Sequence, residues 1–187
     1  NTTNFPANLL GDIPATEVLH ISIADKNSGC RYGIATLQLV IYPEPNLPLN
    51  ITNYVDCDNQ TDSNVDDTNS INGDITLKNK TPEILANYPA SEHSNFTITF
   101  HENLIDAESG VNIINENQYE NTANNQTIYV RVKNNKTNCI NDSLTFDIII
   151  NPLPDFMVDT PVIVCLNNPQ TRLEPINPNA DYSYEWT

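Results

Sequence analysis

An internal repeat of about 109 residues limits the folds open to this chain more than any other pattern in its sequence. Residues 18–45 align without a gap to residues 127–154, and the alignment places Cys30 on Cys139. Apolar residues of the same strand phase coincide, and so do the Pro-x-Pro motifs that follow them. Self-similarity at a fixed period is typical of tandem arrays. A unit of this length has the size of one immunoglobulin-like β-sandwich.

Short stretches of alternating apolar and polar residues recur along the chain. Alternation over about 4–8 residues predicts half-buried strands, and β-branched and aromatic residues suit a pleated sheet. Only residues 102–110 have a pattern suited to a helical turn. We therefore predict an all-β fold of tandem immunoglobulin-like β-sandwich modules joined by Pro-x-Pro linkers. The predicted strands are 19–23, 37–41, 96–100, 128–132, 146–150 and 182–186, with others beginning near 49–51 and 156–158.

Two Pro-x-Pro motifs divide the chain. Proline fixes φ and holds the preceding residue extended, so Pro43-Glu44-Pro45 and Pro152-Leu153-Pro154 are predicted to be semi-rigid linkers. Residues 1–44 are predicted to end one module, 45–152 to form a complete module, and 153–187 to open the next. Since both ends of the chain fall inside a module, we expect neither end to be a natural terminus.

The charge and hydropathy of the chain exclude several classes of protein. With 8 Lys and Arg against 24 Asp and Glu, the net charge is −16. Phosphate contacts need clustered cations, so we expect no nucleic-acid partner and no docking on anionic lipid. Because no apolar run approaches the roughly 18–20 residues of a membrane span, we expect no membrane insertion.

The four cysteines predict an oxidising, extracellular compartment. No two of them form a C-x-x-C pair, which argues against the common zinc sites and thioredoxin-type redox sites. Cys57 and Cys139 are the two cysteines of the predicted complete module, so a self-contained module predicts a disulfide between them. The alternative pairs Cys30 with Cys57 and Cys139 with Cys165, across the linkers. A third interpretation is buried, reduced thiols.

An acidic stretch surrounds the first cysteine of the complete module, and oxygen-bearing side chains recur in it at every second position. Ca²⁺ takes six to eight oxygen ligands, and closely spaced Asp and Asn side chains can surround one ion. The EF-hand pattern is not met, since no Gly occupies its sixth position and no Glu closes it. Two alternatives stay open: a solvated acidic loop, or a Ca²⁺ site formed by Asp56, Asp58, Asp62, Asn64 and Asp66.

No catalytic residue is predicted, and we expect the chain not to be an enzyme. Glu102, Asp106 and Glu108 surround the predicted helical turn, but their spacing does not define the paired carboxylates of a glycosidase. The three histidines are isolated in the sequence, and no Gly-x-Ser-x-Gly motif accompanies them. One of them, His101, falls on the polar phase of its strand.

The order of these features resembles a known family. An alternating strand, a cysteine-containing hairpin and a second strand precede Asn-Pro-Leu-Pro and then Val-Cys-Leu-Asn-Asn-Pro. This order resembles the tandem immunoglobulin-like modules of very large surface proteins from gliding and marine bacteria of the Bacteroidetes type. The most specific pieces are residues 126–132 and 151–154, and the resemblance covers most of residues 16–187. The middle module departs from the next one, which has residues 166–169 in place of the acidic stretch.

The resemblance implies export by the type IX secretion system, display at the cell surface and a non-catalytic role as a stalk or adhesive segment of an adhesin. Expected partners are neighbouring modules of the same chain, and also surface polysaccharide or another cell-surface protein. Asp142-Ser143-Leu144 resembles a motif that such bacteria modify with O-linked glycan, which makes Ser143 a candidate glycosylation site. Two rival functions stay open: a carbohydrate-binding accessory module of a secreted polysaccharide-degrading enzyme, and a structural subunit of a surface filament.

Overall fold

Two β-sheets contain the strands of the described chain. The computed structural model describes residues 15–59, 69–154, 157–158, 160–167, 169 and 171–185. In it, β1 (Ala15–Ala24) and β2 (Arg31–Ile41) form a two-stranded antiparallel sheet. The second sheet has the order β3-β6-β5-β4. These elements confirm the predicted all-β class. The bounds of the second sheet are β3 Tyr54–Cys57, β4 Phe96–His101, β5 Gln126–Asn134 and β6 Ile140–Asn151.

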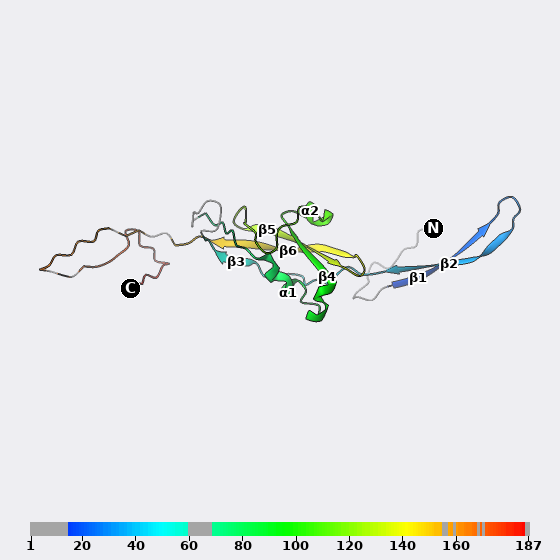
Figure 1. Ribbon diagram of the computed structural model, residues 1–187, viewed down its shortest axis with the longest axis horizontal. Coiled ribbons are helices and arrows are strands. Elements are labelled where there is room, and N and C mark those ends of the chain that lie inside the picture. The colour runs from blue at the N-terminus through cyan, green and yellow to red at the C-terminus, as the bar shows by residue number, and fades with distance from the viewer. Residues whose placement is uncertain are drawn as a thin grey trace.

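The parts of the chain follow one another along a single long axis (Figure 1). The β1–β2 hairpin lies at one end, the four-stranded sheet in the middle, and residues 157–185 at the other end. Residues 182–185 form no strand, so the prediction of one at 182–186 is wrong for the residues described. The corresponding segment of the middle module pairs through one bridge, Ile75 to Tyr119. Likewise residues 49–51 are not a strand, and pairing begins at Tyr54.

The first and last strands of the middle module, residues 45–152, run in the same direction. β3 pairs with β6 in parallel, with Tyr54 opposite Ile148 and Cys57 opposite Asn151. The pairs β5–β6 and β4–β5 are antiparallel. Because β3 opens the module and β6 closes it, the chain enters at one end of the sheet and leaves at the other. The 12 residues of β6 give the sheet a length of about 40 Å at ~3.3 Å per residue.

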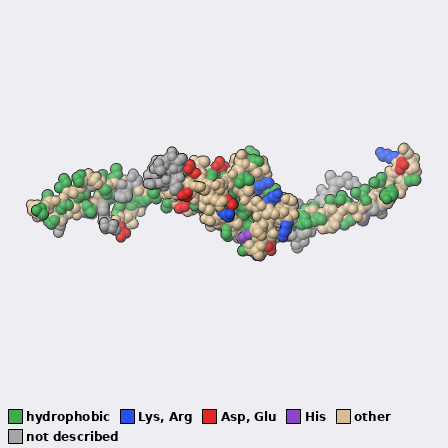
Figure 2. All heavy atoms as spheres, in the orientation of Figure 1, with side chains coloured by type: hydrophobic (Ala, Val, Ile, Leu, Met, Phe, Trp, Pro, Cys, Tyr) green, Lys and Arg blue, Asp and Glu red, His purple; other side chains and the backbone are tan. Residues whose placement is uncertain are grey.

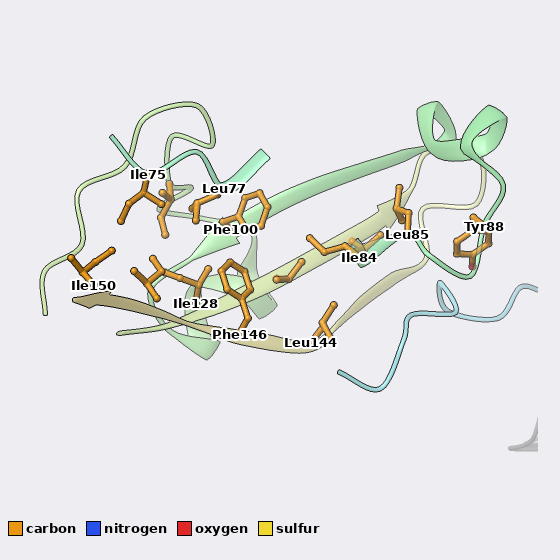
Figure 3. Close-up of a cluster of buried hydrophobic side chains, with 14 residues drawn as sticks. Ile75, Leu77, Ile84, Leu85, Tyr88, Phe100, Ile128, Leu144, Phe146 and Ile150 are labelled. Carbon is orange, nitrogen blue, oxygen red and sulfur yellow. The ribbon is translucent and has the colours of Figure 1, made fainter. Parts of the chain in front are cut away.

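One face of the four-stranded sheet is buried beneath a second layer of the sandwich. That layer contains the bridge at Ile75, the 3₁₀-helix η1 (Leu77–Lys80) and the short helix α1 (Thr81–Ile84). The alternating residues of β5 and β6 meet this layer in the phase that the sequence predicts. Figure 3 shows the resulting core, which contains Ile75, Leu77, Ile84, Leu85, Tyr88, Phe100, Ile114, Ile128, Val130, Val132, Leu144, Phe146, Ile148 and Ile150.

The 3₁₀-helix η2 (Ala90–Asn95) precedes β4, and a second short helix, which follows β4, packs against β4 and β5. The helix α2 (Leu104–Ser109) falls within the predicted helical turn. Arg131 donates hydrogen bonds from Nη1 to the carbonyl oxygens of Ala107 (2.6 Å) and Glu108 (2.7 Å), which fastens α2 to β5. His101 is fully buried, although its phase predicts exposure, since its Nδ1 lies 2.8 Å from the Val111 carbonyl oxygen in the segment after α2.

Candidate functional site

The turn of the β1–β2 hairpin is held by its own side chains. Asp25 Oδ1 accepts a hydrogen bond from the backbone of Asn27 (2.8 Å), and this contact lowers the pKa of the Asp25 carboxyl. Cys30 N donates to Ser28 Oγ (3.3 Å), and Asp25 N donates to the Cys30 carbonyl (2.9 Å). Gly29 occupies the left-handed region at φ 67°. The turn therefore fixes the backbone of Cys30 and leaves its side chain exposed.

The turn of the β5–β6 hairpin repeats this arrangement. Asn134 Oδ1 accepts from the backbone of Lys136 (2.9 Å), and Cys139 N donates to Thr137 Oγ1 (3.2 Å). Asn134 N donates to the Cys139 carbonyl (2.9 Å). Asn138 takes the left-handed conformation at φ 61°, the role that glycine has in the first copy. The repeat read from the sequence thus extends to equivalent hydrogen bonds around the two hairpin cysteines.

Cys57 lies at the end of β3 and its thiol is exposed. Its backbone is fixed on both sides, because its N–H donates to Asp56 Oδ1 (2.8 Å) and its carbonyl accepts from Asn72 Nδ2 (3.0 Å). Asn72 is buried, and its own N–H donates to Asn121 Oδ1 (2.8 Å). Asn121 in turn donates from Nδ2 to the carbonyl of Ser70 (3.0 Å). This buried amide network holds Cys57 in place at the sheet end.

The register of the sheet places Cys57 and Cys139 at opposite ends of the middle module. Cys57 is opposite Asn151, the last residue of β6, whereas Cys139 immediately precedes Ile140, the first residue. The two positions are about 40 Å apart along the strand. A disulfide needs Cα atoms within about 7 Å. The predicted Cys57–Cys139 bond is therefore wrong, and both thiols are unpaired in the structure.

The alternative pairing across the linkers is not formed either. Cys30 lies at the tip of the β1–β2 hairpin, the end of that hairpin farther from the middle module (Figure 1). A bond from Cys30 to Cys57 would have to span both sheets. Cys165 follows the exit from the middle module, whereas Cys139 lies at its entry. All four thiols are unpaired in the structure. The prediction of buried thiols also fails for Cys30, Cys57 and Cys165, which are exposed.

The middle module has two ends. We call the end with Cys139 and the linker the entry end, and the end with Cys57 and Asn151 the exit end. At the entry end the linker is fastened to the sheet. Asn141 Nδ2 donates to the carbonyl of Pro45 (2.9 Å), and Tyr88 Oη accepts from Asn46 N (2.7 Å). Pro45 is itself buried. The second half of the Pro-x-Pro linker thus belongs structurally to the module that it precedes.

A crevice of about 290 Å³ opens at the entry end between the linker and the β5–β6 turn. Tyr42 and Pro43 line one side of it, and Lys136 and Thr137 line another. The Cys139 thiol lies beside it, with Sγ 3.6 Å from the carbonyl oxygen of Tyr42. The hairpin cysteine therefore lies directly at the point where two modules join.

A buried lysine connects the entry segment to the second layer of the sandwich. Lys80 Nζ donates to the carbonyl of Thr52 (2.6 Å), to Thr52 Oγ1 (2.8 Å) and to the carbonyl of Asn53 (3.2 Å). Its ion pair with Glu83 measures 3.2 Å. Burial tends to raise the pKa of Glu83, but hydrogen bonds from Thr52 and the charge of Lys80 lower it overall. Sequence reasoning missed this cluster, because its members are separated by up to 31 residues.

The structure places part of the predicted Ca²⁺ ligand set. Asp58 is buried at the exit end, where its Oδ2 accepts from Ser70 N (2.6 Å) and its Oδ1 has no hydrogen-bond partner. The exposed Asp56 is engaged by Tyr54 Oη (3.3 Å) and Cys57 N. Among the described residues no group of three or more His, Cys, Asp or Glu side chains that could hold a metal ion is found. The other predicted ligands, Asp62, Asn64 and Asp66, lie outside the described residues.

The carboxylates near α2 have structural partners. Glu102 Oε1 accepts from Tyr119 Oη (2.8 Å), and burial followed by this contact raises the pKa of Tyr119 well above its ordinary value. Asp106 accepts hydrogen bonds from Asn103 Nδ2 (2.7 Å) and Asn112 Nδ2 (3.0 Å). These contacts hold the segment around α2 together.

Ser143, the candidate glycosylation site, is exposed near the start of β6. Its Oγ donates to Asn141 Oδ1 (2.7 Å), the same side chain that holds Pro45. A glycan on Ser143 would therefore stand close to the entry linker; its presence stays a prediction.

Comparison with known proteins gives one match. Residues 53–154, just over half of the chain, match the Flavobacterium inter-domain disulphide bond domain. Neither a curated protein nor a solved structure matches the chain. No described helix is long and apolar enough to cross a membrane. A family defined by disulfides points to an extracellular context, because disulfides persist in oxidising compartments. The chain belongs to the Flavobacterium inter-domain disulphide bond domain family.

Proposed function

We propose that this chain is part of a non-catalytic stalk at the bacterial cell surface, in which modules follow one another end to end. The observation that supports this most is the parallel pairing of β3 with β6. Because the first and last strands of the module run in the same direction, the chain enters the module at one end and leaves it at the other. Each module therefore adds its full length to the array. Each module then contributes about 40 Å of reach.

Disulfides between modules reinforce the stalk. The family to which the chain belongs is named for an inter-domain disulphide bond, and the middle module has one cysteine at each end. In a tandem array the exit-end cysteine of one module faces the entry-end cysteine of the next. When the bond forms, the two thiols lose two protons and two electrons to a disulfide oxidant, which is reduced to its dithiol.

The partners of Cys57 and Cys139 then lie in neighbouring modules, and the same holds for Cys30 and Cys165. Equivalent cysteines of adjacent modules cannot pair with each other, because a whole module length separates them. The bond instead joins a β3-type cysteine to a hairpin-type cysteine across each junction.

The stalk belongs to an adhesin exported by the type IX secretion system, as the resemblance to Bacteroidetes surface proteins implies. A carbohydrate-binding module is the rival candidate, and it needs a row of exposed aromatic rings. Among the described residues the exposed aromatic side chains are Tyr32 and Tyr42, which lie on the hairpin and in the linker. Their separation supports the stalk over the carbohydrate-binding function. A filament subunit is a third candidate, and it would require association between separate chains.

Small-angle X-ray scattering on the oxidised full-length protein tests the proposal. We expect a rod whose maximum dimension grows by about 40 Å per module. Replacing Pro43, Pro45, Pro152 and Pro154 by Gly should shorten the maximum dimension, because glycine adds hinge freedom. Pro89→Gly, which precedes η2 inside the module, is the control and should leave the rod unchanged. A compact envelope for the unaltered protein would contradict the stalk and favour the carbohydrate-binding candidate.

A further inference from the structure

We propose that the disulfides at the two ends of a module transmit tension past its folded core, so that the oxidised stalk does not lengthen when it is pulled. The inference rests on the proposed inter-module disulfide and adds a mechanical function to it. Two segments of the middle module, residues 45–57 and 139–151, run side by side from the entry end to the exit end. These two segments are the covalent routes for the tension, and residues 58–138 lie outside both of them.

The two segments run in the same direction and keep one register. β3 pairs in parallel with β6, and Cys57 lies opposite Asn151 at the exit end. Before β3 the segments stay in contact, because Asp147 N donates a hydrogen bond to Asn53 Oδ1 (3.1 Å). Each of these pairs joins positions 94 residues apart. Residues with that spacing therefore lie level with each other along the module.

The same spacing places Pro45 level with Cys139 at the entry end. There Asn141 Nδ2 donates to the Pro45 carbonyl (2.9 Å), so the two segments are still adjacent. Because both pairs of ends are 94 positions apart, the two routes contain the same number of residues and cover the same distance. β6 is already an extended strand of about 40 Å, and the other segment matches it, so neither route has much slack.

The repeat places the disulfide partner of Cys139 beside it. Tyr42 is the counterpart of Asn151, since the repeat offset is 109 residues. Cys57 lies opposite Asn151, so the counterpart of Cys57 in the preceding module lies opposite Tyr42, on a strand about 4.8 Å away. Cys139 Sγ is 3.6 Å from the Tyr42 carbonyl oxygen. The register therefore brings the two cysteines to one point, as a bond between Cα atoms within about 7 Å requires.

Each junction then has two covalent crossings, the Pro-x-Pro linker and the disulfide. Figure 2 shows that the flanking parts of the chain continue from opposite ends of the central body, so a pull along the long axis acts on a module at those ends. Tension that enters through the linker follows residues 45–57 and leaves through the disulfide of Cys57. Tension that enters through the disulfide of Cys139 follows residues 139–151 and leaves through the next linker. Neither route passes through the second layer, so pulling does not separate the sandwich.

The two routes make each module tolerant to the loss of one bond. The entry disulfide alone preserves the route along residues 139–151, and the exit disulfide alone preserves the route along residues 45–57. Only the loss of both disulfides of one module directs the tension through residues 58–138. The module then unfolds, and residues 45–151 gain about 340 Å over the folded length at ~3.6 Å per residue.

Single-molecule force spectroscopy on the full-length protein, held at its two ends, tests the inference. Peptide mapping without reduction first shows whether Cys139 is joined to the Cys57 counterpart of the preceding module. We expect the oxidised, unaltered protein to show no step of about 340 Å. Dithiothreitol reduces each disulfide to two thiols and is itself oxidised to a cyclic disulfide. It should give one such step for each module.

Serine variants provide matched controls in the oxidised protein. Cys57→Ser and Cys139→Ser should each show no step, because one route remains in every module. The double variant should show one step, from the middle module. Reduction of the unaltered protein measures the same step without a substitution, in case a variant does not fold.

Two kinds of failure are distinguishable. A step of about 340 Å in the oxidised, unaltered protein or in either single variant, or no step in the double variant, would overturn the inference and leave the stalk in place. If the mapping finds Cys139 without a disulfide in the untreated protein, the proposed inter-module bond fails, and the inference fails with it.

Discussion

The β1–β2 and β5–β6 hairpins have equivalent sequences and equivalent cysteine turns, but their apolar faces differ in burial. Ile21 is 46% exposed, whereas its counterpart Val130 is fully buried. Ile23 is 65% exposed, whereas its counterpart Val132 is fully buried. The hairpins pair their strands in the same way. The alternating apolar pattern therefore suffices to form a hairpin, whereas burial of the apolar face depends on residues outside the hairpin.

The difference is the second layer of the sandwich. Residues 75–88 cover the apolar face of β5 and β6, whereas among the described residues no such segment covers β1 and β2. Apolar area removed from water stabilises by roughly 25 cal/mol per Å², so the two hairpins gain very different amounts from the same side chains. Isolated two-stranded hairpins are at best marginally stable in water. In the middle module the covering layer therefore adds a stabilising burial that the strand pattern alone does not provide.

The largest expected effect contrasts two equivalent positions, Phe146 in β6 and Leu37 in β2. Phe146→Ala should destabilise the middle module by about 3–5 kcal/mol, because it leaves a cavity under the second layer. Leu37→Ala should change the local stability by less than about 1 kcal/mol, since Leu37 is exposed. Native-state hydrogen exchange measures both free energies in one chain. Equal losses at the two positions would break the comparison.

The second prediction tests how the covering layer is fastened. Lys80→Met should cost the middle module about 2–4 kcal/mol, because it leaves the carbonyls of Thr52 and Asn53 without this donor and removes the ion pair of Glu83. Lys78→Met is the control, since its ion pair with Glu116 is exposed and should contribute less than about 1 kcal/mol. Urea unfolding followed by circular dichroism gives both values. A Lys80→Met variant as stable as the control would show that the layer does not depend on this lysine.

The third prediction concerns the exit end, where the acidic stretch has no counterpart in the β1–β2 hairpin. If Ca²⁺ binds there, mass action should stabilise the folded module by about 2.7 kcal/mol at 100 times the dissociation constant. Asp58→Asn should abolish this gain, and Asp74→Asn, an exposed acid outside the predicted ligand set, should keep it. Thermal unfolding in millimolar Ca²⁺ and in chelator measures the difference. An unchanged melting temperature would leave the stretch as a solvated loop.

The smallest expected effect is a pH dependence specific to the middle module. The pKa of Glu83 is lower in the folded state than in the unfolded chain, so its contribution to stability is present above the ordinary pKa near 4.5 and is lost as pH falls through the lowered value. Glu83→Gln should remove this part of the acid destabilisation. Urea midpoints between about pH 3 and 7 test it. Identical pH profiles for Glu83→Gln and the unaltered protein would show that Glu83 does not contribute.

Side-chain contacts over long sequence distances explain where sequence-based expectations fail. The strand phase of β5 and β6 was predictable, because alternation directly reports which side chains share a face. The burial of His101 was not, because the segment after α2 covers the polar phase of β4 from a distance of 10 residues. The role of Asn141 was not predictable either. Its hydrogen bond to the Pro45 carbonyl joins residues 96 positions apart, and the chain has many asparagines.

The sequence by itself determined the repeat, the hairpins, the cysteine turns and the linkers, because each depends on residues only a few positions apart. The tertiary structure decided where the cysteines lie relative to one another. An antiparallel pairing of β3 with β6 would have brought Cys57 toward the start of β6 and Cys139, and the parallel pairing separates them by the length of the sheet. The direction of β3 relative to β6 depends on contacts between segments far apart in the sequence, such as the hydrogen bond from Asp147 N to Asn53 Oδ1 (3.1 Å), which local patterns do not report. The two cysteines that the sequence alone pairs within one module therefore lie at opposite ends of that module.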